Sequence, residues 1–409
     1  MENVSSSNGL EKRPKLRFPG SDEPYRTITL GQIASLVNRT DPTSNAPIMM
    51  LSAGNGFIMQ SEKYSRDNAG QSLKKYILLK KGELAYNHGA SKAKQYGCCY
   101  ELTEDEARIP YVYHCFKVSG AEHTPYVATA LNNPKIDRQL KRLVSSSVRM
   151  DGLLNISFDD YMSVILHLPS LKEQTHIADF LKKLDERITA QEKLVASLKK
   201  YKRGLLRKVF AKLSDSCEKR NLKEVSVLFA DGDWIESKDQ ALDGIRLIQT
   251  GNVGFGVYID KTQNAKYISE TTFHRLNCLE IYDGDILISR LPEPAGRACL
   301  LPKSTERRIT AVDCTVIRTD SSVIDRNYLL QFLCSEQYLK TVNSFLAGGT
   351  RQRISRKNLE GIEVPYPSID EQRYWGSFLC KVDARISNEE QRRSSLSRLR
   401  CFMLQQLFI

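Results

Sequence analysis

One motif occurs twice in this chain, and this repeat constrains the fold more than any other feature of the sequence. Residues 168–174 read LPSLKEQ and residues 366–372 read YPSIDEQ, so that Glu173 corresponds to Glu371. The same offset relates Phe180 to Phe378, Asp185 to Asp383, Ile188 to Ile386 and Leu198 to Leu396. A constant offset over so many positions indicates a duplicated architecture rather than chance similarity.

Each copy of the motif begins with the residues of a helix-capping box, a serine followed three positions later by a glutamate. In such a box the serine hydroxyl accepts the amide of the glutamate, and the glutamate carboxylate reaches back to the amide of the serine. A proline precedes the serine in both copies. The four predicted capping residues are Ser170, Glu173, Ser368 and Glu371. We therefore expect a helix to begin at each motif.

The residues after each capping box follow a heptad pattern. Steps of four and three residues from Ile177, and likewise from Trp375, meet apolar side chains at most positions, which is typical of a coiled-coil seam. The polar interruptions of the two seams also correspond: Gln191 and Lys202 in the first, Glu389 and Arg400 in the second. A solenoid or a homodimer could use such seams, but pairing within the chain is the simplest way to bury both. Gly376 is expected to loosen or kink the start of the second helix, because glycine costs about 1 kcal/mol relative to alanine there.

The segments before the two helices correspond more loosely and indicate two diverged α+β domains. Residues 81–86 (KGELAY) parallel residues 283–288 (DGDILI), and residues 325–346 predict a helix. The predicted strands cover residues 76–79, 84–87, 111–118, 286–290, 297–301 and 310–318. The predicted order begins with a flexible N-terminal tail over residues 1–19 and a first domain over 20–168. A first spacer helix over 169–213 follows. The second domain covers 214–366, with a linker at 214–220, and a second spacer helix covers 367–409.

The charge of the chain is compatible with a nucleic-acid partner. There are 60 lysines and arginines against 48 aspartates and glutamates, a net charge of +12, and such an excess permits an anionic partner. The ten cysteines form no Cys-x-x-Cys pair and lie mostly in apolar runs, so we expect core residues in a reduced, cytoplasmic protein. No apolar stretch is long enough to cross a membrane, and the polar N-terminus does not resemble a signal peptide.

The motifs expected of an enzyme that binds nucleotides or transfers methyl groups are missing from the sequence. It has no phosphate-binding loop, and residues 132–134 (NNP) lack the second proline and the aromatic residue of a methyltransferase motif. Residues 251–256 (GNVGFG) do not have dinucleotide-binding spacing and indicate a turn or a close approach to DNA. Asp283 and Asp285 flank a glycine and are expected to be turn residues rather than metal ligands. We therefore expect no catalytic centre, metal or cofactor in this chain.

Several polar and basic segments are candidates for contact with DNA. Residues 348–353 (GGTRQR) combine glycines, which let the backbone approach phosphates, with the arginine and glutamine side chains that pair with guanine and adenine edges. A helix-capping glycine followed by solvated arginines is nearly as good an interpretation. Basic loops directly after two predicted strands are further candidates, and solvated surface is an equally good interpretation of each. The predicted DNA-binding residues are Asn87, His88, Lys92, Lys94, Arg149, Arg290, Arg297, Gly348, Gly349, Thr350, Arg351, Gln352 and Arg353.

The repeated helix motif, residues 14–20 (PKLRFPG) and residues 348–354 (GGTRQRI) resemble the specificity subunits of type I restriction–modification systems. The resemblance covers nearly the whole chain. It implies two target-recognition domains, each reading one half of an asymmetric bipartite site in double-stranded DNA, separated by two long helices that form an intramolecular antiparallel coiled coil. It also implies two modification subunits, which carry S-adenosylmethionine, and restriction subunits, which carry ATP and magnesium. The chain itself would hold no cofactor, catalyse no reaction and contact no membrane.

Two other kinds of protein remain as alternatives. A coiled-coil assembly scaffold with two protein-binding heads would share the same repeated layout, and specific, salt-dependent binding to duplex DNA separates it from a DNA-reading subunit. An enzyme with its own nuclease centre is disfavoured by the missing motifs.

Overall fold

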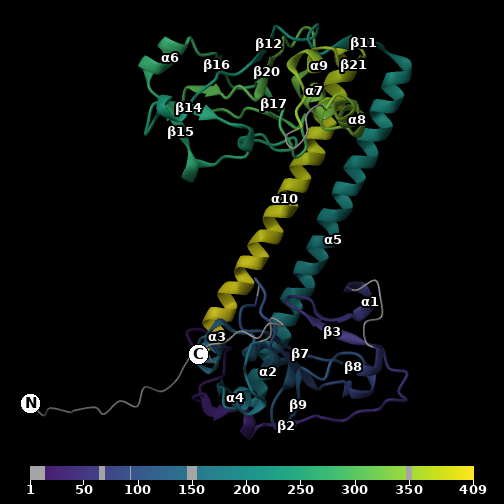
Figure 1. Cartoon of the computed structure of the whole chain (residues 1–409), viewed down its shortest axis with the longest axis vertical. Coiled ribbons are helices and arrows are strands. Elements are labelled where there is room, and N and C mark those ends of the chain that lie inside the picture. Colours follow the sequence, from purple (N-terminus) through teal and green to yellow (C-terminus); the bar gives the residue numbers. More distant parts are fainter. Residues whose placement is uncertain (1–13, 64–69, 93, 145–153, 347–351) are drawn as a thin grey trace, which may run out of the picture. The chain divides into compact units, whose positions relative to one another are not determined.

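The computed structural model describes residues 14–63, 70–92, 94–144, 154–346 and 352–409 (Figure 1). The chain divides into two compact units, which we call the first unit (residues up to Ala190, together with Arg393–Ile409) and the second unit (Gln191–Arg392). Each unit contains a mixed domain of helices and sheets together with a part of both long helices. The fold is therefore α+β, with two mixed domains and a helix pair, as the sequence predicts.

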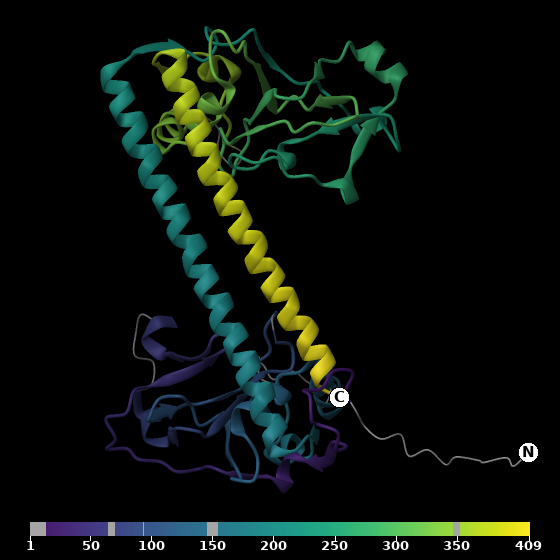
Figure 2. The same ribbon diagram turned by 180° about the vertical axis from the view of Figure 1, so that it is seen from behind.

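The two long helices are α5 (Leu171–Ser216, 46 residues) and α10 (Ile369–Leu407, 39 residues). Within each unit they lie side by side (Figures 1 and 2). In the second unit, Gln191 Nε2 donates to Glu389 Oε2 at 2.6 Å, and Lys202 Nζ lies 2.6 Å from Asp383 Oδ1. Residue numbers rise along one helix as they fall along the other, so the pair is antiparallel. The predicted intramolecular antiparallel coiled coil is confirmed.

The apolar seam positions are buried in part between the helices and in part in the domain cores. Those that are buried are Ile177, Leu181, Leu184, Val195 and Val209 in α5, and Leu379, Ile386 and Leu407 in α10. At one end of the pair Ile177, Leu181 and Leu407 belong to the core of the first domain. Beyond Lys202 the buried face of α5 also includes Leu206 and Phe210, because this end of the helix packs into the core of the second domain.

The two serines of the repeated motif have the same role in the structure, whereas the two glutamates differ. The Ser170 and Ser368 hydroxyls accept the amides of Glu173 and Glu371, at 3.4 Å and 3.3 Å, as in a capping box. The Glu173 carboxylate is fully buried and binds the Arg17 guanidinium, with Arg17 Nη2 2.6 Å from Glu173 Oε2 and Arg17 Nε 3.1 Å from Glu173 Oε1. Glu371 is exposed. The repeat therefore preserves the serine cap, while Glu173 has become a buried anchor for the N-terminal segment.

Residues 14–19, which we expected in the flexible tail, include this anchored segment. Besides the Arg17 pair, the Leu16 amide donates to the Gln406 carbonyl at 3.1 Å. The segment is ordered because a buried carboxylate requires a cation beside it.

The glutamine of each motif ties a long helix to the domain before it. Gln174 Oε1 accepts the amide of His123 at 2.9 Å, and Gln372 Oε1 accepts the amide of Asp325 at 3.0 Å. Each of these amides belongs to the residue just before a domain helix: α2 (Thr124–Leu131) in the first unit and α7 (Arg326–Leu333) in the second. The two glutamines are buried. Because both domains attach to their helices in the same way, the duplicated motif marks a duplicated joint.

The expected kink at Gly376 does not occur, since α10 is continuous through this residue. A Cβ built on Gly376 would lie 2.5 Å from Asp325 Oδ1 and 2.7 Å from the Tyr328 amide nitrogen. The glycine therefore lets the start of α7 approach α10 closely, and the loss of helix propensity is offset by this contact.

Gly376→Ala should consequently destabilise the second unit, by about 1–3 kcal/mol, because the added methyl group overpacks the contact with α7. Gly204 in α5 is the matched control, since a Cβ there would meet nothing within 4 Å, and Gly204→Ala should stabilise its helix by up to about 1 kcal/mol. Both glycines lie in the second unit, and denaturant unfolding monitored by hydrogen exchange in that unit measures both effects. Equal stabilisation by the two substitutions would show that the close approach at Gly376 is not needed.

The first domain is built from short antiparallel strands and small helices. Its main sheet has the order β2-β9-β6-β7, and three strand pairs, β1–β10, β3–β4 and β5–β8, complete it. The strands are β1 (Arg26–Thr29), β2 (Ala34–Leu36), β3 (Met49–Ser52), β4 (Gly56–Met59), β5 (Ile77–Lys80), β6 (Leu84–Asn87), β7 (Cys98–Glu101), β8 (Glu106–Ile109), β9 (His114–Val118) and β10 (Ile165–Leu168). The helices besides α2 are η1 (Leu30–Gln32), α1 (Gln60–Lys63), η2 (Gly70–Lys75), α3 (Pro134–Leu143) and α4 (Phe158–Met162).

The second domain has a four-stranded sheet, β12-β20-β17-β18, and a five-stranded sheet, β13-β15-β14-β19-β16, in which β14 and β19 are parallel. The strands are β11 (Glu218–Asn221), which pairs with β21 (Glu363–Tyr366), β12 (Leu228–Asp231), β13 (Gln240–Ala241), β14 (Ile245–Ile248), β15 (Lys266–Ile268), β16 (Glu280–Ile281), β17 (Ile286–Ser289), β18 (Ala298–Leu300), β19 (Arg308–Thr310) and β20 (Cys314–Arg318). The helices besides α7 are η3 (Ser237–Asp239), η4 (Thr250–Asn252), η5 (Thr262–Asn264), α6 (Glu270–Leu276), α8 (Glu336–Ser344) and α9 (Arg356–Glu360).

Residues 325–346 form two helices rather than the predicted one. The chain turns after α7, and the Ser335 hydroxyl accepts the Tyr338 amide at 3.2 Å to cap α8. Serine competes for backbone hydrogen bonds and favours a helix start over a helix interior, which explains the break.

The cysteines lie mainly in the cores, as predicted. All ten are free thiols, and Cys98, Cys314 and most of the others are buried. Burial raises the pKa of Cys98 and of Cys314 to about 11, so these thiols remain protonated and behave as small apolar groups. No helix in the described part of the chain is long and apolar enough to cross a membrane.

Candidate nucleic-acid interface

A buried arginine joins three segments of the second domain where strand β17 ends. Arg290 Nη2 donates to the Val312 carbonyl at 2.5 Å and lies 3.3 Å from Asp231 Oδ2. The Arg290 carbonyl in turn accepts the Ile354 amide at 3.2 Å. Burial lowers the pKa of Arg290, and the Asp231 carboxylate opposes that shift. Arg290, which the sequence suggested as a DNA contact, is thus turned inward and fixes the loops around it.

Arg297 has a similar inward role at the start of β18. Its guanidinium donates to four backbone carbonyl oxygens, at distances of 2.7–3.0 Å: those of Thr250, Val253, Leu291 and Pro294. Burial also lowers the pKa of this group. Because its donors are occupied by carbonyls, Arg297 holds the segment around η4 against the loop after β17, and it does not present a guanidinium to a partner.

Gln352 and Arg353 are the described residues of the GGTRQR segment, and both are exposed. Arg353 Nη1 lies 3.8 Å from Asp313 Oδ1, a long ion pair that leaves the side chain 53% exposed. The next residue, Ile354, is fully buried and bonded to Arg290. A fixed backbone therefore carries an exposed amide and an exposed guanidinium that has only one long ion pair. The predicted contacts Arg149, Gly348, Gly349, Thr350 and Arg351 lie outside the described residues.

The first domain contains the same junction with a histidine in place of the arginine. His88 Nε2 lies 2.9 Å from the Val112 carbonyl, and His88 Nδ1 lies 2.9 Å from the Leu154 carbonyl. The His88 carbonyl accepts the Leu154 amide at 2.9 Å, as Arg290 accepts that of Ile354. His88 follows β6 as Arg290 follows β17. In both domains, therefore, side-chain nitrogens at this position lie within hydrogen-bonding distance of backbone carbonyls and fix the corresponding loops.

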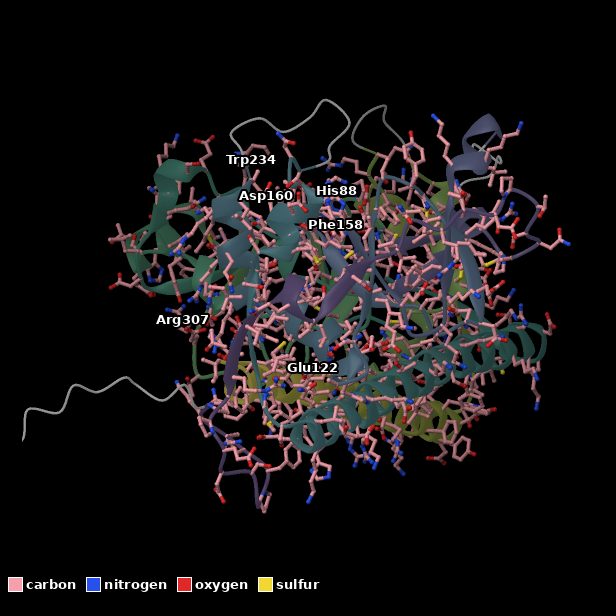
Figure 3. All side chains as sticks on the ribbon, turned by 90° about the horizontal axis from the view of Figure 1, so that it is seen from below. His88, Glu122, Phe158, Asp160, Trp234 and Arg307 are labelled. Atoms are coloured by element: carbon pink, nitrogen blue, oxygen red, sulfur yellow. The ribbon has the colours of Figure 1, made fainter. Side chains whose placement is uncertain are left out.

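A second histidine supports this junction. The His114 ring centroid lies 4.9 Å from that of His88 and 5.8 Å from that of Phe158, the two residues that Figure 3 labels beside this junction. His114 Nε2 lies 2.9 Å from the Ile156 carbonyl. Burial lowers the pKa of His114, against the opposing effect of its hydrogen bond to Ile156, and so favours the neutral ring.

Among the other predicted contacts of the first domain that the structure describes, Lys92 is exposed, whereas Asn87 and Lys94 are partly buried. Asn87 Oδ1 accepts the Gly89 amide at 2.9 Å, and Lys94 Nζ donates to the Asn132 carbonyl at 2.7 Å. Burial lowers the pKa of Lys94. Asn87 and Lys94 therefore shape their loop, while Lys92 points to solvent.

The sequence did not single out a polar cleft in the second domain, next to η4. The cleft has a volume of about 170 Å³, and Arg246, Gln249, Gly251, Asn252, Lys261 and Lys266 are among the residues that line it. The only sequence signal near it was the GNVGFG segment. Lys261 and Lys266 belong to no motif, so the sequence gave no indication that they line the same cleft.

Asp283 and Asp285 are structural, as expected from their place in a turn. Asp285 is buried and accepts two hydrogen bonds from Arg318, at 2.8 Å and 2.7 Å, while Asp283 pairs with Arg308. Among the residues that the structure describes, no group of three histidine, cysteine or acidic side chains could hold a metal ion.

Comparison with known proteins relates this architecture to one family. Residues 214–398 match the family model of the type I restriction modification DNA specificity domain. The type I restriction enzyme MjaVIII specificity subunit of Methanocaldococcus jannaschii is 23% identical over 273 residues, covering 62% of this chain and 64% of the relative. The putative MjaX specificity subunit of the same organism is 22% identical over 240 residues, covering 56% of this chain and 55% of the relative. The matches thus span less than two thirds of either relative.

Two solved structures share the fold along almost the whole chain. The S subunit of a type I restriction–modification system from M. genitalium aligns with a TM-score of 0.57 at 16% identity, covering 97% of this chain and 99% of that chain. A chain solved in work on complex assembly and conformational transition of the type I R-M system aligns with a TM-score of 0.55 at 18% identity, with the same coverage.

Proposed function

We propose that this chain is a DNA specificity subunit of a type I restriction–modification system, and that its two domains each read one half of an asymmetric, bipartite DNA site. The observation that carries this proposal is the duplicated junction. Arg290 and His88 occupy corresponding positions, and each fixes the loops at the same end of its domain. The side chains presented there differ between the domains, which is what two unlike half-sites require.

We further propose that methyl transfer and cleavage are performed by partner subunits. Two modification subunits would supply S-adenosylmethionine and the methyl-transfer site, and restriction subunits would supply ATP- and magnesium-dependent translocation and cleavage. The chain would contribute sequence selection and an assembly surface, and it would act in the reducing cytoplasm. The missing phosphate-loop and methyltransferase motifs support this division of labour.

Genome-wide mapping of methylated adenines in the host, with and without this chain, tests the proposal. We expect methylation of one bipartite sequence that disappears when the chain is removed and returns when it is supplied again. The purified chain alone should transfer no methyl group. A methylation pattern that is unaffected by removal, or methyl transfer by the chain without partners, would contradict the proposed function. A pure assembly scaffold would show no salt-dependent preference for any duplex sequence.

Arg353→Ala should weaken binding to the recognised site by about 1–3 kcal/mol if its exposed guanidinium contacts a base, and Gln352→Ala should act in the same direction. Arg356→Ala is the matched control, because Arg356 is also exposed but pairs with Glu360 within helix α9. Competition binding with specific and scrambled duplexes measures the effect. Equal loss for both duplexes would identify a phosphate contact, and no loss for either variant would remove this segment from the interface.

A further inference from the structure

Residues 252–259 of the second domain form a small, closed β-hairpin. At its base, the Ile259 amide donates to the Asn252 carbonyl at 2.8 Å, and Asn252 Nδ2 donates to the Ile259 carbonyl at 2.9 Å. Val253 and Tyr258 pair across the hairpin, and the Gly254 amide closes the tip on the Val257 carbonyl at 2.9 Å. The hairpin lies between strands β14 and β15, which Figure 1 labels.

The backbone of this hairpin is held from several sides. Arg297 donates to the Val253 carbonyl at 2.7 Å, and the Gly256 amide donates to the Ala298 carbonyl at 2.8 Å. Gly256 has a φ of +74°, and a Cβ on it would lie 3.0 Å from Cys334 Sγ. A glycine is therefore required at the tip, and the hairpin is a rigid feature rather than a loose loop.

The rigid tip presents apolar side chains to solvent. Phe255 is 48% exposed and Val257 is 57% exposed. An exposed aromatic side chain on a fixed backbone has already lost most of the freedom that binding would remove, so it suits contact with a partner.

The cleft beside the hairpin base supplies positive charge. Lys261 and Lys266 line it, and in the described part of the chain neither has an ion-pair partner. The third cation, Arg246, is neutralised by Asp260, 2.9 Å away. An apolar tip next to two unpaired lysines complements the edges of DNA bases next to their phosphates.

From this juxtaposition we infer that the hairpin enters the major groove of the half-site read by the second domain, with Phe255 against a thymine methyl group and Lys261 and Lys266 on the flanking phosphates. The major groove admits a two-stranded β-ribbon, and an apolar side chain is the usual contact for the thymine methyl. This inference rests on the proposed function and adds the residues that carry recognition in one domain.

The first test measures binding of the full chain, purified with its modification subunits, to a labelled duplex carrying the mapped site. Phe255→Ala should weaken binding roughly tenfold, because an apolar base contact is lost. Phe402→Ala is the matched control, since Phe402 is 50% exposed but lies on α10, and it should leave DNA binding unchanged. Unchanged binding by Phe255→Ala overturns the inference.

The second test removes the methyl group from the DNA instead. Replacing the thymines of each half-site in turn by deoxyuridine should weaken binding of the unsubstituted protein at one position, in one half-site only. At that position Phe255→Ala should show no further loss. Equal losses for the two proteins would place the methyl contact elsewhere and contradict the assignment.

The lysines are tested through the salt dependence of the same binding. Lys261→Ala and Lys266→Ala should weaken binding to all sequences alike and each reduce the slope of affinity against salt by about one ion. If Phe255→Ala instead releases a modification subunit while DNA binding is preserved, the hairpin contacts protein and the inference is wrong. If the unsubstituted protein does not distinguish the mapped site from a scrambled duplex, the proposed function itself fails and the inference fails with it.

Discussion

Arg17→Ala is expected to lower the free energy of unfolding of the first unit by about 3–5 kcal/mol, because it leaves a buried carboxylate without its cation. Glu173 is fully buried and receives both Nε and Nη2 of Arg17, and Tyr25 lies beside the same carboxylate, with its hydroxyl 3.5 Å from Glu173 Oε1. Burial and the Glu173 charge both raise the pKa of Tyr25, so that this hydroxyl stays protonated and cannot replace the lost cation's charge. Denaturant titration followed by hydrogen exchange in the first unit measures the loss.

The repeat provides the control for this prediction. Glu371 corresponds to Glu173 but is exposed, so Glu371→Gln should leave the second unit unchanged, while Glu173→Gln should destabilise the first. If Arg17→Ala and Glu371→Gln have equally small effects, the buried pair is not an anchor for the N-terminal segment.

Arg290→Ala is expected to cause the largest loss of sequence recognition among single substitutions in the second domain. Removing its guanidinium leaves the Val312 carbonyl without its donor and Asp231 Oδ2 without its cation, while Asp231 Oδ1 keeps its hydrogen bond from Thr315. Removing one partner of a buried ion pair costs about 3–5 kcal/mol. The loops that carry Arg353 and the 252–259 hairpin are held by this residue and its neighbour Arg297. We therefore expect faster hydrogen exchange in these loops and a greater loss of specific binding than Arg353→Ala produces.

Arg307 is the matched control for Arg290. It makes more ion-pair contacts, with Glu270 and Glu280, but it is 44% exposed, and Figure 3 labels it. Exposed pairs contribute little because water screens them, so Arg307→Ala should leave both stability and DNA binding nearly unchanged. A similar effect of the two substitutions would show that Arg290 acts only as one more surface charge, and not as a positioning residue.

The arrangement of the long helices was predictable because it follows from periodic local signals. Capping serines, heptad spacing and matching polar positions all repeat along the chain, and the structure pairs Lys202 with Asp383 and Asp185 with Arg400 in the reciprocal manner that an internal repeat implies. Each of the six predicted strands overlaps an observed one, but predicted residues 310–318 contain the end of β19 and, after a turn, all of β20, and most of the other strands were not predicted. These features depend on neighbours in sequence, which the sequence displays directly.

The roles of individual charged residues were not predictable in the same way. Arg290, Arg297 and His88 stand in polar loops that suggest solvent exposure, yet each turns inward to carbonyl oxygens contributed by distant segments. Gly376 suggested a weak helix because its contact with α7 is not visible in the local sequence. The role of such a residue depends on the backbone groups that the folded chain brings next to it, and these come from segments that are distant in the sequence.

The central claim, that each domain reads its own half of a bipartite site, is tested most directly by exchanging residues 20–168 for the corresponding segment of a relative with a different site. Genome-wide mapping of methylated adenines then reads the recognised sequence of the exchanged protein. We predict that one half of the site changes to that of the relative while the other half stays as it was. A site that changes in both halves, or in neither, would contradict the division of recognition between the two domains.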